Sequence, residues 1–341
     1  MSEDGPRGWQ RPSIYDVARE AGVSHMTVSR VLNGHPNIRE STRERVLKAI
    51  EEMNYTRSSI ARALATRRAM RIGVLVDGPV QYGPNSTLRA LESAARDVGY
   101  AISAFSISDD EESSIDTGVV DLVTQGVDAL CVIAPRASSL DNLRRQATGL
   151  PTIVIKAEPD AVWHTVAVDQ RAGATLAVTH LIDLGHRRIM HVSGPLDWYD
   201  ATEREQGWRD ALTAAKLPIR PPVAGDWTSD YGFELASSYD FEDVTAVFAG
   251  NDQMALGLVH GLAQRGLRVP EDISVVGFDD LPDARHFLPP LTTVRQDFDA
   301  LGELALRAII AAIEDDEDAP QHDMIEPRLI VRSSAAAPHS A

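Results

Sequence analysis

The chain has 341 residues, of which 43% are hydrophobic, and its formal net charge at pH 7 is -17. A chain of this length can bury more than one hydrophobic core, so two or three domains are expected. It contains no run of about 18 apolar residues, which argues against a membrane partner. Its single cysteine, Cys131, excludes an intramolecular disulfide framework and a cysteine-rich zinc site.

The charges are distributed unevenly along the chain. Residues 1–71 contain 13 Lys and Arg against 8 Asp and Glu, a balance of +5, whereas the rest of the chain has a balance of -22. This asymmetry predicts a small nucleic-acid-binding head joined to a large acidic body that repels phosphate. Because +5 is only modestly basic, we expect two heads to act together on DNA.

Three short helices are predicted near the N-terminus. A capping-box pattern at Ser13 starts the first, Gly22 allows a turn after it, and Ser24 caps the second. Ser41 and Glu44 form another capping-box pattern at the start of the third. Two helices joined by a glycine turn are typical of a helix-turn-helix, although any small three-helix domain would give the same periodicity.

The amino-acid sequence of this segment indicates a particular family more specifically than its helical periodicity does. "IYDVAREAGVSHMTVSRVLNG", followed by "STRERV" and "AIEEMNY", resembles the DNA-binding head of the LacI/galactose-repressor family of bacterial regulators. The resemblance implies a palindromic operator, with the second helix in the major groove. The residues expected to contact DNA in the head are Tyr15, Ser24, His25, Met26, Thr27, Ser29, Arg30, Asn33 and Thr42. His25 and Met26 occupy the positions that contribute much of the operator preference in the family.

A basic segment, residues 57–70, connects this head, residues 1–56, to the first strand-like run, "RIGVLV". It can be interpreted as a charged linker. It also resembles the hinge helix of the same family, which orders on operator DNA and inserts a leucine into the minor groove. Leu64, with Ala61 nearby, matches that position. Such a wedge unstacks a base step and bends the DNA toward more protein surface.

From residue 71 onward, apolar runs alternate with amphipathic helical patterns. Runs such as "RIGVLVD", "ALCVIAP", "TAVFAG" and "SVVGFDD" predict an α/β fold with parallel sheets, and the span fits two doubly wound lobes. Ligands in such folds bind at the carboxyl ends of strands. That criterion selects Asp77, Lys156, Asn251 and Asp279, although each of them alone would also suit a turn or a helix cap.

"GDWTSDYGFE", "AGNDQMALG" and "LRVPEDISVVGFDDLP" resemble the effector domain of the same family, and the similarity covers nearly the whole body. The resemblance implies a periplasmic-binding-protein-like body, residues 71–341, that holds a sugar between two lobes. Lobe 1 is expected at about 71–168 and 298–325, and lobe 2 at about 169–295 and 326–335. The expected effector-binding residues are Asp77, Pro84, Lys156, Trp198, Asp200, Arg204, Trp227, Asn251, Asp279, Gln296 and Phe298. Such polar groups satisfy sugar hydroxyls, while aromatic faces cover the C–H surface.

Three positions depart from the lactose-repressor pattern within the family. Lys156 replaces an acid, Ile133 an amide and Asp77 a serine. We expect Asp77 to pair with Lys156 and to take over a sugar-facing carboxylate role, because pairing relieves the cost of burying either charge. The alternative is that Lys156 binds an anionic effector such as a sugar phosphate. Trp198 and Tyr199 are expected to be exposed beside the cleft, where they either stack on a second sugar ring or pack against the body.

No nucleophile-elbow, P-loop, dinucleotide-binding or zinc-protease motif is present, so we expect no enzyme activity and no cofactor. His180, His186 and His191 are assigned structural roles rather than a metal site. The start lacks a signal-peptide core and the end lacks heptads, which predicts a homodimer in the bacterial cytoplasm, associated with the nucleoid through its operator.

The predicted function is repression of a carbohydrate-utilisation operon, relieved by a galactoside or another disaccharide. Two alternatives within the regulator class are a co-repressed regulator and one that senses a sugar phosphate through Lys156. A free-standing sugar-binding protein is a third alternative, which the DNA-binding head argues against.

Overall fold

The computed structural model describes residues 12–32, 35–53, 55, 68–78, 80–107, 114–133, 136–146, 148–316 and 321–338. The chain divides into two compact units, Met1–Ala69 and Met70–Ala341. Three of the predicted DNA contacts, Asn33, Ala61 and Leu64, lie outside the described residues. No helix in the described ranges is long and apolar enough to span a lipid bilayer.

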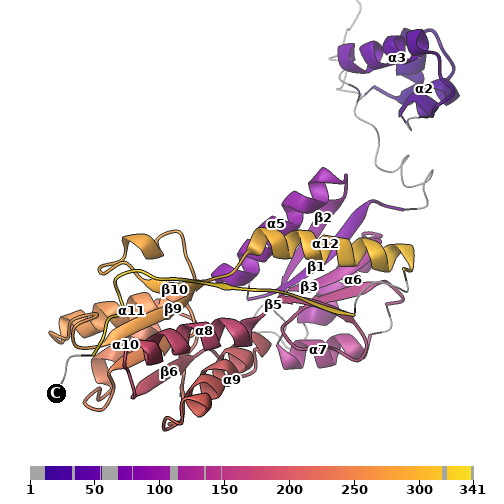
Figure 1. Ribbon diagram of the computed structural model, residues 1–341. Coiled ribbons are helices and arrows are strands. Elements are labelled where there is room, and N and C mark those ends of the chain that lie inside the picture. Colours follow the sequence, from indigo (N-terminus) through magenta and orange to yellow (C-terminus); the bar gives the residue numbers. More distant parts are fainter. Residues whose placement is uncertain are drawn as a thin grey trace, which may run out of the picture. The chain divides into compact units, whose positions relative to one another are not determined.

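The described part of the head consists of three helices packed on one small core (Figure 1). These are α1 Ile14–Glu20, α2 His25–Leu32 and α3 Glu40–Glu52. The core is formed by Val17, Ala18, Ala21, Val28, Val31, Val46 and Ala49. The capping box predicted at the start of α1 is confirmed, since Asp16 N–H donates to Ser13 Oγ at 3.3 Å and Ser13 N–H donates to Asp16 Oδ2 at 2.9 Å.

The capping box predicted at the start of α3 is wrong. The helix begins at Glu40, one residue before Ser41, and Arg39 occupies the N-cap position without a side-chain hydrogen bond. The carbonyl of Arg39 accepts from the N–H groups of Thr42 and Arg43 at 2.9 and 3.0 Å, so helical hydrogen bonding already includes Ser41. An acid at Glu40 also suits the positive end of the helix dipole.

Lobe 1 of the body contains a six-stranded parallel sheet in the order β11-β5-β4-β3-β1-β2 within the described residues. Its strands are β1 Arg71–Asp77, β2 Ala101–Ile107, β3 Ala129–Ile133, β4 Thr152–Ile155, β5 His164–Val168 and β11 His322–Ile325. Its helices are α5 Tyr82–Asp97, α6 Ser114–Thr124, α7 Ala137–Arg144 and α12 Phe298–Glu314. The α12 helix packs beside α5 on one face of this sheet (Figure 1).

Lobe 2 repeats this arrangement in the order β12-β10-β9-β8-β6-β7, with only β12 antiparallel to its neighbour among the described strands. Its strands are β6 Ile189–Ser193, β7 Val223–Ala224, β8 Ala246–Ala249, β9 Ser274–Asp279, β10 Thr292–Arg295 and β12 Arg328–Ile330. Its helices are α8 Gln170–Asp183, α9 Tyr199–Ala214, α10 Ser229–Ser238, α11 Asp252–Gln264 and the short 3-10 helix η1 Ala284–His286.

The described chain passes between the lobes three times, from β5 to α8, from β10 to α12 and from β11 to β12. In each sheet the strand order reverses at a switch point, between β1 and β3 in lobe 1 and between β6 and β8 in lobe 2. Ligands of open α/β sheets bind at the carboxyl ends of strands beside such points. The topology therefore predicts that ligand-binding residues lie in the loops that follow β1, β4, β6, β8 and β9.

Candidate functional site

A cleft of about 600 Å³, its open mouth included, lies between the two lobes. Ten of the eleven predicted effector-binding residues line it, and Asp77 is the exception. Those ten are Pro84, Lys156, Trp198, Asp200, Arg204, Trp227, Asn251, Asp279, Gln296 and Phe298. A cleft of this size suits a small ligand that is largely buried between the lobes.

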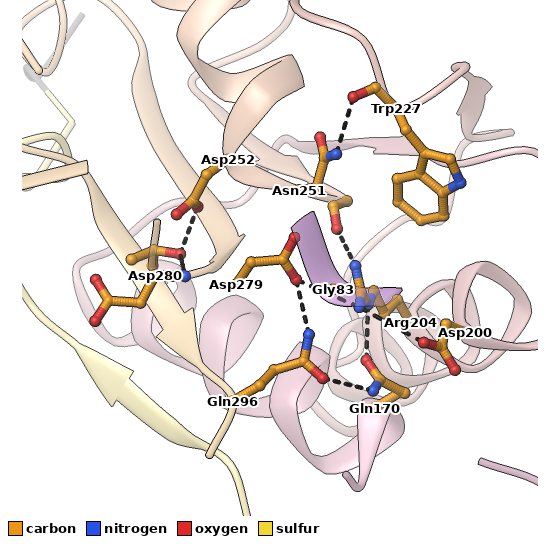
Figure 2. Close-up of polar contacts among 12 residues, drawn as sticks. Gly83, Gln170, Asp200, Arg204, Trp227, Asn251, Asp252, Asp279, Asp280 and Gln296 are labelled. Atoms are coloured by element: carbon orange, nitrogen blue, oxygen red, sulfur yellow. Dashed lines mark hydrogen bonds and ion pairs between the residues drawn. The ribbon is translucent and has the colours of Figure 1, made fainter. Parts of the chain in front are cut away.

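Arg204, on α9, is the centre of the polar network in this cleft (Figure 2). Its Nε donates to Gln170 Oε1 at 2.8 Å, and its Nη1 donates to the Gly250 carbonyl at 2.6 Å. Its Nη2 lies 3.6 Å from Asp279 Oδ1 and 4.0 Å from Asp200 Oδ2. One buried guanidinium therefore faces two carboxylates without a close hydrogen bond to either, which leaves carboxylate oxygens available to a ligand.

Two amides link this arginine to Asp279. Gln170 Nε2 donates to Gln296 Oε1 at 2.8 Å, and Gln296 Nε2 donates to Asp279 Oδ1 at 2.7 Å (Figure 2). Each amide thus has its orientation fixed by one donor and one acceptor contact. Gln170 was not among the residues predicted from the sequence, although it begins α8 directly after β5 and Asp169, which is the same strand-end signal that selected Asn251 and Asp279.

Asn251 lines the cleft and also serves as a helix cap, as its position after a strand allowed. Its Oδ1 accepts from Met254 N–H at 2.9 Å and so caps α11, while its Nδ2 donates to the Trp227 carbonyl at 2.9 Å. Trp227 and Asp279 both have positive φ angles, 72° and 109°. Non-glycine residues in this conformation are strained, and such strain is concentrated at binding sites.

The two carboxyl groups near Arg204 have altered acidity. Burial raises the pKa of Asp279 to about 6, against the opposing effects of the Arg204 charge and the Gln296 hydrogen bond. Burial also raises the pKa of Asp200, and the Arg204 charge opposes this change. The carboxyl of Asp279 is consequently expected to be ionised at neutral pH and to become protonated in mildly acidic solution.

Effector affinity should therefore fall as the pH is lowered below 6. A carboxylate accepts hydroxyl hydrogen bonds more strongly than a neutral carboxyl, so the dissociation constant should rise about tenfold between pH 7 and pH 5. The contribution of Asp279 to folding stability has the opposite pH dependence to effector affinity. Its pKa in the folded state lies above the ordinary 3.8, so this contribution is fully present below pH 3.8 and is lost as the pH rises through 6. Calorimetric titrations at both pH values test the expectation, and D279N should flatten the profile.

The predicted ion pair between Asp77 and Lys156 is wrong. Arg136 Nη2 lies 2.7 Å from Asp77 Oδ1, and Ser139 Oγ donates to Asp77 Oδ2 at 2.9 Å, so this buried carboxylate serves the structure of lobe 1. Lys156 Nζ lies 3.0 Å from Asp160 Oδ2 instead. Asp77 is thus paired with the loop after β3 and Lys156 with a residue of its own loop after β4, and Asp77 does not line the cleft.

The charge of Lys156 is further stabilised across the cleft. Its Nζ lies 4.4 Å from the centre of the Tyr199 ring, which belongs to lobe 2. Burial would raise the pKa of Asp160, but hydrogen bonds from Val162 and Lys156 and the charges of Lys156 and Arg144 outweigh it, so this pKa lies below its ordinary value. Asp160 is thus an ionised partner for the Lys156 ammonium.

The loop before α9 forms a contact between the lobes. Trp198 is not exposed as predicted but only 7% accessible, and its ring packs where a side chain at Gly78 of lobe 1 would otherwise lie. Ala137 N–H of lobe 1 donates to the Asp197 carbonyl of lobe 2 at 3.1 Å. The ring of Trp198 lies edge-on to that of Trp227 with centroids 6.1 Å apart, so two indoles form an aromatic corner of the cleft.

The histidines that the sequence places close together have separate structural contacts. His186 Nδ1 pairs with Thr245 Oγ1 at 3.0 Å, and His191 Nδ1 pairs with the Phe248 carbonyl at 3.0 Å. Burial lowers the pKa of His191 to about 4. Within the described ranges, no group of three or more His, Cys, Asp or Glu side chains is arranged to hold a metal ion.

Several residues predicted to contact DNA lie exposed on the head, at and near the start of α2. Ser24 Oγ accepts from Thr27 N–H at 3.1 Å, which confirms the predicted cap of this helix. Tyr15 and Met26 are 62% and 57% accessible, and the Tyr15 ring lies 5.0 Å from that of His25. Ser24 and Arg30 are also exposed, whereas Thr27, Ser29 and Thr42 are half-buried. The first turn of α2 contains no acidic residue that would repel phosphate.

Comparison with known proteins identifies the family. The profile described as "Bacterial regulatory proteins, lacI family" matches residues 13–58, and the one described as "Periplasmic binding protein-like domain" matches residues 178–335. The lactose operon repressor of Escherichia coli (strain K12) is 31% identical over 332 residues, which cover 96% of this chain and 92% of that repressor. This chain belongs to the LacI family.

Further LacI-family proteins match over most of their length. The HTH-type transcriptional repressor PurR of Haemophilus influenzae (strain PittEE) is 34% identical over 337 residues, 94% of this chain and 98% of PurR. The solved lac repressor dimer bound to operator and the anti-inducer ONPF has a TM-score of 0.85 at 30% identity, covering 96% of this chain and 100% of that one.

A complex of the transcriptional regulator CelR with cellobiose has a TM-score of 0.72 at 30% identity, covering 95% of this LacI-family chain and 100% of CelR. The predicted fold, a helix-turn-helix head with a two-lobed body, is confirmed by the family profiles and by the lac repressor structure. The lactose operon repressor and PurR are both repressors by name.

Proposed function

We propose that this LacI-family chain represses a carbohydrate-utilisation operon and that a neutral sugar bound between its lobes releases it from a palindromic operator. The observation that carries the proposal is the chain of hydrogen bonds that runs from Arg204 through Gln170 and Gln296 to Asp279 in the interlobe cleft, beside the 3.6 Å ion pair of Arg204 with Asp279. Oriented carboxylate and amide groups satisfy sugar hydroxyls. The neighbouring indole of Trp227 offers an aromatic face to the C–H surface of a sugar ring.

The charges of the cleft favour a neutral effector over a sugar phosphate. Lys156 already pairs with Asp160, so its ammonium is not an open anion site. On the lobe-2 side, Asp200 and Asp279 share the guanidinium of Arg204, which gives that side an excess of one negative charge when both acids are ionised. A phosphate placed there would meet repulsion, whereas hydroxyl groups would find acceptors.

We favour a galactoside or another disaccharide as the effector. The aromatic corner formed by Trp198 and Trp227 can cover the C–H surfaces of two linked rings. The similarity to the lactose operon repressor and to a CelR–cellobiose complex supports this class. Binding would act through differential affinity, with the effector stabilising the lobe arrangement that holds DNA less well.

In the head we assign base contacts to His25 and Met26 at the exposed start of α2. Tyr15, Ser29 and Thr42 are assigned to the DNA backbone, which fixes orientation rather than sequence preference. A homodimer would present two such heads to the two halves of a palindrome, and so would overcome the modest charge of each head. The similarity to an operator-bound lac repressor dimer supports this arrangement in the bacterial cytoplasm.

Fluorescence anisotropy on labelled DNA from upstream of the gene tests the proposal. Binding should weaken steeply with salt and should be reversed by one of a panel of lactose, cellobiose and methyl galactosides or glucosides. M26A should change the preferred operator bases while leaving the sugar response intact. Release by glucose 6-phosphate alone would contradict the neutral effector, and a sugar that tightens binding would show co-repression instead.

A further inference from the structure

The two sides of the cleft differ in chemistry. Lobe 2 supplies the charged and amide groups of the Arg204 network, whereas lobe 1 supplies a mostly apolar wall. The apolar residues on that wall include Ile133, Ile155, Val168, Phe298 and Leu301. A ligand that spans the cleft must therefore place its hydroxyl-rich side on lobe 2 and a largely C–H surface on lobe 1.

Most polar side chains on the lobe-1 side already have partners within that lobe. The Lys156 ammonium pairs with Asp160 at 3.0 Å. Thr87 Oγ1 donates to the Gly83 carbonyl at 2.9 Å. Both groups are held by partners in their own lobe, and among the described residues Gln81 is the remaining polar side chain on this wall.

Gln81 stands between the end of β1 and the start of α5 and lines the cleft. It occupies the N-cap position of α5, but its side chain makes no capping hydrogen bond. Its Oε1 is buried and accepts no hydrogen bond from any part of the chain that the structure describes. A buried acceptor without a partner destabilises a protein, so such a group requires an explanation, and a bound ligand supplies one.

The surroundings of Gln81 Oε1 define what it can meet. This oxygen and the Trp198 ring both lie next to Gly78, where a side chain would overlap the ring. A hydroxyl that reaches Oε1 would therefore belong to a ring whose C–H face lies near an indole. This combination of one acceptor with an aromatic surface is a feature of sugar recognition.

We propose that Gln81 is a specificity-determining residue of the effector site, which accepts a hydrogen bond from one hydroxyl on the lobe-1 side of the bound sugar. The inference rests on the proposed function and deepens it: the effector is a neutral saccharide that presents a single hydroxyl, within an otherwise C–H surface, to lobe 1. A site built to receive a hydroxyl discriminates strongly against an analogue that lacks it.

Calorimetry on the full chain, with wild type and Q81L titrated in parallel with lactose, cellobiose and their monodeoxy derivatives, tests this proposal. Leucine keeps the approximate size of the side chain and disturbs no capping bond. Q81L should bind the parent sugar about tenfold more weakly, a factor that corresponds to about 1.4 kcal/mol. One monodeoxy derivative should lose the same factor on wild type and nothing further on Q81L. V80A, at an 83% accessible neighbour, is the matched control.

The outcomes separate this proposal from the proposed function. If wild type and Q81L bind the same sugar equally well, Gln81 has no part in recognition, although the sugar-binding function stands. Additive losses from Q81L and from every deoxy position would equally overturn the assigned contact. If wild type binds neither sugar, the proposed effector class fails and this inference fails with it. Thermal unfolding of Q81L, expected at the wild-type midpoint, excludes a general loss of structure.

Discussion

The R204M variant should retain operator binding but lose its response to the effector. Arg204 joins Gln170, the Gly250 carbonyl and Asp279 in one network, and methionine replaces none of these contacts. Without the guanidinium, Gln170 and Asp279 lose the partner that orients them in the cleft. Effector affinity should therefore fall by at least about a hundredfold, which corresponds to about 2.8 kcal/mol. Anisotropy on operator DNA with increasing effector measures this as a shift of the release curve.

The loss of Arg204 should also change the acidity of its neighbours. Its positive charge lowers the pKa of Asp279 and of Asp200 against the effect of burial. Without the guanidinium, both carboxyls should become protonated more readily, which limits the destabilisation of the fold at neutral pH. R204M should thus remain folded while its cleft no longer offers ionised acceptors to a sugar.

R209M provides a matched control on the same helix. Arg209 pairs with Glu205 at 2.6 Å, and its side chain is 35% accessible, so its ion pair lies partly in solvent. Pairs of this kind contribute about 0–1 kcal/mol. R209M should respond to the effector like wild type. A normal response in R204M as well would show that the network of Figure 2 does not bind the effector.

The strand ends could be predicted from the sequence because they depend on local pattern. Apolar runs followed by Lys156, Asn251 or Asp279 indicate where a strand stops, and the parallel topology brings these ends to one cleft. The same pattern cannot say whether a residue faces the cleft or the adjoining loop. Asp77 ends β1 as expected, yet its carboxylate turns to Arg136 in the loop after β3.

The sequence could not predict which charged and polar side chains pair with one another. Lys156 lies next to Asp160 because the short loop after β4 folds back, a conformation that no periodicity encodes. Gln170 and Gln81 were overlooked for a related reason: glutamine is frequent in surface positions, and only the closure of two lobes around it makes it part of a site. Tertiary structure, rather than residue type, gives these amides their significance.

G257A should destabilise the body strongly although alanine is the better helix former. The α10 and α11 helices lie side by side (Figure 1). They approach each other closely at glycines. A side chain at Gly257 would overlap the Ser229 carbonyl oxygen, and one at Gly232 would overlap that of Met254. A carbonyl oxygen within a helix cannot rotate away, so the helices must separate. The expected loss is about 3 kcal/mol or more, against a helix-propensity gain of about 1 kcal/mol.

This helix contact also positions one wall of the cleft. Trp227 lies just before α10, Asn251 caps α11, and the Asn251 amide donates to the Trp227 carbonyl at 2.9 Å. Separating the helices by the width of a methyl group should pull this pair apart. G257A should therefore weaken effector binding even where the protein remains folded, which connects a packing glycine to recognition without any direct contact with the ligand.

Urea denaturation followed by tryptophan fluorescence measures the first effect and calorimetry with the effector the second. G83A is the matched control for the unfolding measurement, because a side chain there would meet only the Phe298 ring at 4.0 Å, an ordinary contact. Its unfolding midpoint should stay close to that of wild type. Equal midpoints for G257A and G83A would mean that α10 and α11 separate at little cost, and the position of Trp227 would then need another determinant.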